Sequence, residues 1–99
     1  MGRESSSNVV GAQAAIFASC GQSCVAGSRL LVHRSVHAEM VEKLSLAAVN
    51  IPVGAPMDPA TQIGPVNNQR QWSKIDEMVR DAVSQGAKIT SGGAKPEAL

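Results

Sequence analysis

The density of proline between residues 50 and 65 is the feature that most restricts how this 99-residue chain can fold. The segment also carries two glycines, and its helix-breaking residues are Pro52, Gly54, Pro56, Pro59, Gly64 and Pro65. A helix cannot continue through so many prolines, because proline has no N–H to donate and its ring clashes with the preceding turn. The sequence therefore predicts an extended, well-defined loop, with one brief strand near Ile51.

On both sides of this loop, apolar residues recur at helical spacing. The segment from Ser35 to Val49 has an apolar stripe opposite charged residues, which is typical of a surface helix. A second amphipathic helix is predicted from Asn67 to about Gln85, with Gly86 as its C-terminal stop. The apolar positions of the two helices are Val36, Met40, Val41, Leu44, Ala47 and Ala48, and then Trp72, Ile75, Met78, Val79, Ala82 and Val83.

A third helix is predicted near the start of the chain. Ser5 to Asn8 offers several N-cap residues, and the following run from Val9 to Phe17 is apolar on nearly every side. A helix with apolar residues all round belongs in a protein interior. The sequence thus predicts a buried helix whose C-terminal end leads into the next loop.

Two short apolar runs, at residues 29–33 and 87–90, are predicted to be strands. The first contains Leu30, Leu31 and Val32 in succession, and such continuous apolar character favours a parallel sheet that is covered on both faces. With no internal repeat, the order of strands and helices predicts the α/β class, with helices packed on a short, mostly parallel open sheet.

The chemistry of the chain concentrates between Phe17 and Arg29, which reads FASCGQSCVAGSR. Small residues surround Cys24, so a substrate could approach its sulfur atom. The thiolate of such a cysteine is a competent nucleophile. The alternative interpretation is that Cys24 is a small buried apolar residue, which is the commonest role of a free cysteine.

This stretch resembles the active-site signature of the aldehyde dehydrogenase superfamily, Phe-x-Asn-x-Gly-Gln-x-Cys, with Cys24 at the nucleophile position. Ser19 stands where the family usually has asparagine. Two later segments also resemble the family in order and spacing, so the resemblance covers roughly residues 7–93. These segments are Val53 to Pro65, similar to Gly-x-Pro-x-Asp-x-x-Thr-x-x-Gly-Pro, and Gln85 to Lys88 followed by Gly92-Gly93.

The resemblance implies an NAD(P)-dependent aldehyde dehydrogenase in which Cys24 is the catalytic residue. Its thiolate would attack an aldehyde, and a thioester would form and then be hydrolysed to a carboxylic acid, or transferred to coenzyme A in acylating relatives. The backbone N–H of Cys24 would help to hold the oxyanion. Such enzymes use NAD or NADP as cofactor and are commonly homodimers or homotetramers.

The length of the chain is too small for a complete enzyme of this kind. Residues 1–99 are interpreted as a partial catalytic domain that bears the nucleophile, with the cofactor-binding domain absent. No Gly-x-Gly-x-x-Gly turn occurs, so no cofactor-binding residue is assigned. The family's general-base glutamate would precede residue 1. We therefore predict no turnover from the isolated chain.

Composition gives no sign of a nucleic-acid or membrane partner. The chain is 43% hydrophobic and 17% charged, with a net charge of +1, and Phe17 and Trp72 are its only aromatic residues. Neither an electrostatic surface for phosphates nor a stacking platform for bases is expected. No signal peptide or membrane span is recognisable, which predicts a cytoplasmic protein with reduced cysteines.

Two rival hypotheses come from other classes of protein. A zinc site of the Cys2His2 type would use Cys20, Cys24, His33 and His37, but the spacing between the pairs is shorter than in zinc fingers, so no metal ligand is assigned. The other rival is a non-catalytic interaction or structural fragment.

Four further positions near the motifs receive structural interpretations. Cys20 is expected to pack, Gln22 to fix the turn by hydrogen bonds, Arg29 to brace the nucleophile loop or pair with a carboxylate, and Gly92-Gly93 to form a turn.

Overall fold

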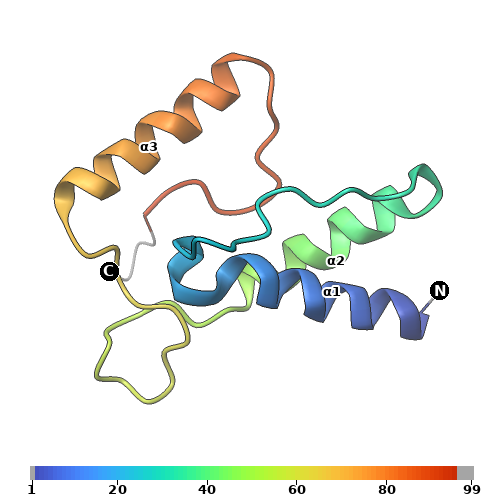
Figure 1. Cartoon of the computed structure of the whole chain (residues 1–99), viewed down its shortest axis with the longest axis horizontal. Helices are drawn as coiled ribbons and strands as arrows, with labels where there is room; N and C mark the ends of the chain where they lie inside the picture. The colour runs from blue at the N-terminus through green and yellow to red at the C-terminus, as the bar shows by residue number, and fades with distance from the viewer. Residues whose placement is uncertain (1, 96–99) are drawn as a thin grey trace.

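The computed structural model describes residues 2–95, and the side chains of residues 7–95. This part of the chain contains three α-helices, α1 (Gly2–Phe17), α2 (His37–Val49) and α3 (Gln69–Ser84). Two short 3-10 elements, η1 (Ala18–Gly21) and η2 (Arg34–Val36), follow α1 and precede α2. Figure 1 shows α1 and α2 side by side, with the extended segment 22–33 leading from the end of one back to the start of the other.

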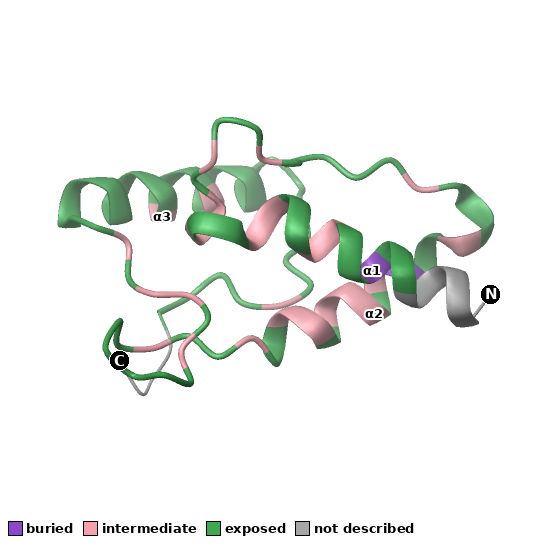
Figure 2. Cartoon of the chain, turned by 60° about the horizontal axis from the view of Figure 1, so that its bottom comes forward, coloured by how far each residue is buried: buried purple, intermediate pink, exposed green. Residues whose placement is uncertain are grey.

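The buried part of the molecule is confined to the contact between α1 and α2. Val9 on α1 and Met40 on α2 are the buried apolar residues of the described part, with 8% and 6% of their surfaces exposed. Figure 2 shows this buried region where the two helices meet. Elsewhere the helices are half-buried or exposed, and Val10, next to Val9 in the sequence, is 65% exposed.

The prediction for the first helix is therefore right about its type and wrong about its start and its burial. The helix begins at Gly2 and not after Ser5–Asn8, which lie inside it. Among the described elements, α1 packs against α2 and against η1 that follows it. One neighbouring helix can cover one side of an apolar helix, so the other side remains exposed.

The predicted helix at 35–49 is confirmed. The short element η2 that precedes it is capped by His33, whose Nδ1 accepts the backbone N–H of Ser35 at 3.1 Å. On the outer side, Lys43 Nζ lies 2.9 Å from Glu39 Oε1, the one-turn spacing at which opposite charges support a helix.

The helix predicted at 67–85 is also confirmed, as α3. It is capped by Asn68 and not by Asn67, because the Asn68 side chain accepts the N–H of Gln71 at 2.8 Å. Its C-terminus is a Schellman motif. Gly86 has a φ of +101°, and the N–H of Ala87 donates to the Ala82 carbonyl oxygen at 2.9 Å.

Helix α3 packs against no other helix in residues 2–95. Its apolar side chains are correspondingly open: Trp72 is 40% exposed, Ile75 37% and Met78 62%. Helix α3 thus has the predicted apolar face, but the described residues provide no surface against which this face packs. None of the described helices is long and apolar enough to cross a membrane.

The loop at 50–65 is held by backbone hydrogen bonds, as expected for the well-defined loop that was predicted. Ile63 donates its N–H to the Pro52 carbonyl oxygen at 3.1 Å, and Gly54 donates to Ile63 at 3.1 Å. These bonds form an isolated parallel bridge between Val53 and Ile63. The brief strand expected near Ile51 is this single bridge.

The predicted strands at 29–33 and 87–90 are not formed within the described residues, so the sheet is not confirmed. Neither run has a ladder partner within residues 2–95, so both lack strand hydrogen bonds. Leu31 is 95% exposed and Ile89 45%. A strand exists only when another segment pairs with it, and apolar patterning alone does not provide that segment. The predicted sheet with helices packed on it is therefore not formed by the described part, which is mostly helical.

Candidate functional site

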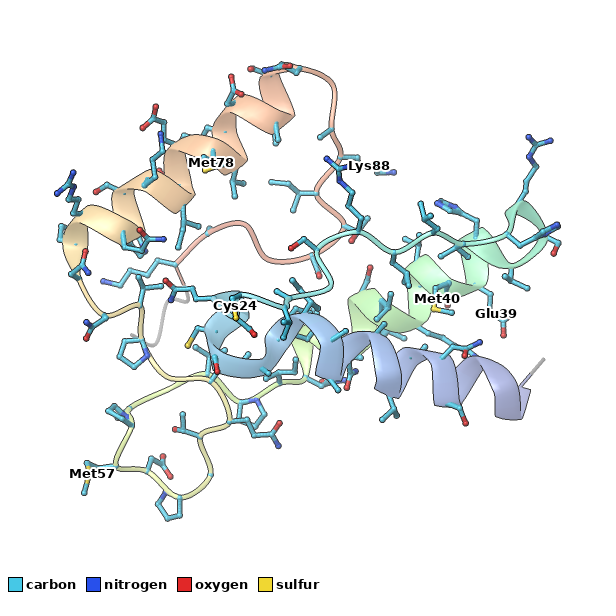
Figure 3. The ribbon with its side chains drawn as sticks, in the orientation of Figure 1. Cys24, Glu39, Met40, Met57, Met78 and Lys88 are labelled. Carbon is cyan, nitrogen blue, oxygen red and sulfur yellow. The ribbon has the colours of Figure 1, made fainter. Side chains whose placement is uncertain are left out.

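Cys24 lies on the loop that follows α1 and η1, and it is exposed. Figure 3 shows it on this loop, above the C-terminal end of α1. The thiol is accessible from solvent, as a nucleophile requires. The alternative interpretation of Cys24 as a buried apolar residue is wrong.

A left-handed turn leads from α1 into this loop. Ser19 has φ and ψ of 53° and 39°, Cys20 has 59° and 27°, and Gly21 continues with a φ of 75°. Left-handed conformations cost roughly 1–2 kcal/mol for each residue that carries a Cβ, and successive ones are rare. The turn is closed by the N–H of Gln22, which donates to the Ser19 carbonyl oxygen at 3.1 Å. The hydrogen-bonding role expected for Gln22 is thus carried by its backbone.

The hydrogen bonds around the nucleophile leave the backbone N–H of Cys24 open. Ser23 accepts hydrogen bonds from two neighbouring backbone N–H groups. Its Oγ accepts from Val25 at 3.3 Å, and its carbonyl oxygen accepts from Ala26 at 3.1 Å. The N–H of Cys24 has no partner among residues 2–95. An open N–H beside an exposed thiol is a suitable donor for an oxyanion that forms on the carbon attacked by the sulfur.

The far side of the loop is held against α1. Gly27 donates its N–H to the Ala15 carbonyl oxygen at 2.9 Å, and a Cβ at position 27 would lie 3.0 Å from the Ala15 Cβ. The small residues after Cys24 therefore serve this close approach as well as access to the sulfur. Their packing role could not be read from the sequence.

Cys20 differs from Cys24 in its surroundings. It is half-buried, and its thiol donates to the Gly64 carbonyl oxygen at an Sγ to O distance of 3.4 Å. It also lines an apolar hollow of about 580 Å³ that includes Ile63, Trp72 and Ile75. Sequence reasoning anticipated a packed residue here and missed the hydrogen bond, for which a pair 44 positions apart offers no local signal.

Arg29 and the Gly92-Gly93 pair were also singled out by the sequence. Arg29 is exposed and forms no ion pair with a described residue. Gly92 and Gly93 have φ values of +69° and +85°, as the predicted turn requires.

The clearest electrostatic effect lies outside the site: a hydrogen bond to Asp76 raises the pKa of Arg80.

The described residues do not form a site for a metal or for a dinucleotide. No cluster of three or more histidine, cysteine or carboxylate side chains occurs among them, and His33 Nδ1 is engaged by Ser35, with its Oγ at 2.8 Å. The segments before α2 and α3 contain no glycine-rich turn that would bring backbone N–H groups to a pyrophosphate. The residues present therefore do not fit NAD or NADP by themselves.

Comparison with known proteins finds aldehyde dehydrogenases among solved structures and sequence relatives. The NAD+ complex of an aldehyde dehydrogenase from Bacillus cereus superposes with a TM-score of 0.86 at 32% identity, over 89% of this chain and 18% of that one. The fold of the described part is thus that of a segment of aldehyde dehydrogenases of known structure.

Sequence relatives agree. The (Z)-2-((N-methylformamido)methylene)-5-hydroxybutyrolactone dehydrogenase of Acinetobacter baylyi is 46% identical over 80 residues, which are 81% of this chain and 16% of that protein. A chloroplastic aminoaldehyde dehydrogenase of Arabidopsis thaliana is 44% identical over 79 residues, 80% of this chain and 16% of that protein. The sequence model of the aldehyde dehydrogenase family matches residues 4–99. The chain belongs to the aldehyde dehydrogenase family, and it spans about 16% of the length of these relatives.

Proposed function

We propose that Cys24 is the nucleophile of an NAD(P)-dependent aldehyde dehydrogenase and that residues 1–99 are part of its catalytic domain. The observation that carries this proposal is the exposed Cys24 thiol beside its own open N–H, at the position of the family signature. The substrate is an aldehyde, and the product is a carboxylic acid.

The chemistry that this chain contributes is the first covalent step. The Cys24 thiolate attacks the carbonyl carbon of the aldehyde, and the negative charge moves to the carbonyl oxygen. The open N–H of Cys24 stabilises that oxyanion, while a second donor comes from residues outside this chain. In the complete enzyme NAD or NADP would supply the acceptor for the hydride that leaves the carbon bound to the Cys24 sulfur. The resulting Cys24 thioester is hydrolysed to the acid or passes its acyl group to coenzyme A.

The α/β architecture belongs to this proposal too. We expect the runs at 29–33 and 87–90 to pair with further strands of the complete catalytic domain in a mostly parallel sheet. Their exposure supports this, because Leu30 is 50% exposed and Leu31 95%. An unpaired apolar segment of this kind gains hydrogen bonds and burial when a sheet forms.

The proposed assembly is what the resemblance implies, whereas the proposed location and partners rest on the sequence composition. We propose that the complete enzyme is a homodimer or homotetramer in the cytoplasm, with no nucleic acid or membrane as partner. A chloroplastic relative shows that members of the family occupy other compartments. Cell fractionation of the complete enzyme tests the location, and light scattering tests the assembly.

The decisive experiment for the nucleophile uses the 99-residue chain and p-nitrophenyl acetate, an ester whose acyl transfer passes through an oxyanion. Acetylation of Cys24 and Cys20 is followed by mass spectrometry of the separated peptides. We expect Cys24 to be acetylated several-fold faster than Cys20, because it is exposed and has the open N–H. Equal rates at the two cysteines would contradict the proposal.

A second assay addresses turnover by the isolated chain. We expect no reduction of NAD or NADP with any aldehyde above the level of a Cys24→Ala control, since the described residues form no dinucleotide site. Reduction above that control would show that these residues suffice for catalysis.

A further inference from the structure

The thiol of Cys20 connects two loops that are distant in the sequence. Its Sγ donates to the Gly64 carbonyl oxygen, 44 positions away, and thereby joins the turn after α1 to the proline-rich loop. Side-chain hydrogen bonds in the neighbouring loops are local by contrast. The bonds from Val25 to Ser23 and from Ala60 to Asp58 each span two positions.

The turn that Cys20 occupies needs support from outside. Ser19 and Cys20 both carry a Cβ in the left-handed region, where such residues are strained. Besides the bonds within η1 itself, the turn is closed by the N–H of Gln22, which donates to the Ser19 carbonyl oxygen. Strained backbone persists where the surrounding structure determines it, and the bond to Gly64 is the side-chain hydrogen bond that ties this turn to a distant segment.

The acceptor of this bond is well held. Gly64 precedes Pro65, and proline restricts the backbone of the residue before it. The neighbouring Ile63 is fixed by its bonds to Pro52 and Gly54. The Gly64 carbonyl oxygen is thus a stable point to which the Cys20 thiol can attach the turn.

We propose that Cys20 is a positioning residue for the nucleophile, which it serves by fixing the turn from which the Cys24 loop departs. The inference rests on the proposed role of Cys24. With the turn held to Gly64, the loop keeps the Cys24 N–H open toward the side from which a carbonyl group is attacked. Without that bond the left-handed turn relaxes, and the donor no longer lies beside the sulfur in a fixed direction.

The test compares two reactions of Cys24 in the 99-residue chain. Acetylation by p-nitrophenyl acetate needs the oxyanion donor, whereas alkylation by iodoacetamide forms no oxyanion and depends on the thiolate and its exposure. In Cys20→Ala we expect acetylation of Cys24 to fall about threefold, the size of effect given by a weak hydrogen bond, while alkylation stays within about twofold. Cys20→Ser keeps a donor and should restore the acetylation rate.

Two companion variants separate positioning from general loss of structure. Cys20→Gly also lacks the thiol donor, but glycine adopts the left-handed conformation without strain. This variant therefore shows the effect of losing the bond in an unstrained turn. Gly64→Ala keeps the acceptor carbonyl and places its Cβ in open space, so it should behave as the parent chain. We expect acetylation to fall less in Cys20→Gly than in Cys20→Ala, because glycine removes the strain that the bond offsets, and to be unchanged in Gly64→Ala.

Amide hydrogen exchange gives an independent measurement. Exchange at the Gln22 N–H, which closes the turn, should accelerate in Cys20→Ala and return in Cys20→Ser. Unchanged acetylation and unchanged Gln22 exchange in both Cys20→Ala and Cys20→Gly would overturn the positioning role. If instead the parent chain acetylates Cys24 no faster than Cys20, the proposed function of Cys24 fails, whatever the exchange data say about the turn.

Discussion

Gly27 lies against Ala15 so closely that no side chain fits between them. The N–H of Gly27 donates to the Ala15 carbonyl oxygen at 2.9 Å, and a Cβ on Gly27 would stand 3.0 Å from the Ala15 Cβ. This contact turns the nucleophile loop back onto α1. Because the Ala15 Cβ is attached directly to a helix backbone, it cannot move aside as the end of a long side chain can.

We predict that Gly27→Ala destabilises the packing of this loop on α1 by about 1–3 kcal/mol, the usual cost of overpacking. Urea unfolding followed by circular dichroism measures the change, and exchange of the Gly27 N–H locates it. Replacing Ala15 by glycine in the same chain should recover part of the loss, since it removes the opposing Cβ.

Gly11 provides the matched control for this substitution. It lies inside α1, and a Cβ there meets nothing within 4 Å. Gly11→Ala should therefore stabilise the helix by roughly 0.5–1 kcal/mol, because alanine loses less backbone entropy than glycine. A loss of stability in both variants would show that the Gly27 effect does not come from the Ala15 contact.

Ser19 is the position at which this chain departs from the family signature, and its backbone explains why asparagine suits the site. Asparagine enters the left-handed region more readily than other residues with a side chain. We predict that Ser19→Asn stabilises the turn by up to about 1 kcal/mol and that Ser19→Val destabilises it. Exchange at the Gln22 N–H, which donates to Ser19, reports the change. Faster exchange in Ser19→Asn would contradict this account.

The helices could be predicted from the sequence because their signals are local. The periodicity at 35–49 and 67–85 and the stop at Gly86 each depend on residues within a few positions of one another. The strands could not be confirmed in the same way, since Leu30 and Leu31 need partners that the described residues do not provide. Local patterning predicts the type of an element, whereas pairing depends on distant segments.

The candidate site shows the same division. Cys24 was singled out from a motif of adjacent residues and is exposed, and its role as nucleophile stays a prediction. The bond from Cys20 to Gly64 spans 44 positions, and the closeness of Gly27 to Ala15 depends on how the loop returns to the helix. Neither relationship leaves a pattern in the sequence, because both arise from the path of the chain in space.

The start of α3 gives a prediction with a neighbouring control. Asn68 accepts the Gln71 N–H at 2.8 Å, whereas the side chain of Asn67 forms no hydrogen bond with a described residue. Asn68→Ala should destabilise the helix by about 1 kcal/mol, the usual value of an N-cap, and Asn67→Ala should have little effect. Exchange at the Gln71 N–H and the fluorescence of Trp72 report on this turn. Equal effects of the two substitutions would refute the capping assignment.

The end of α3 provides a test in which backbone conformation is separated from packing. Gly86 has a φ of +101°, and a Cβ at this position would meet nothing within 4 Å. Any cost of Gly86→Ala must therefore come from the backbone, and we predict a loss of about 1–2 kcal/mol in helix stability. The Schellman bond from Ala87 to Ala82 should weaken with it, which faster exchange of the Ala87 N–H would reveal. Gly86→Asn should lose less, because asparagine accepts positive φ more readily than alanine, and an equal loss in the two variants would contradict a conformational cause.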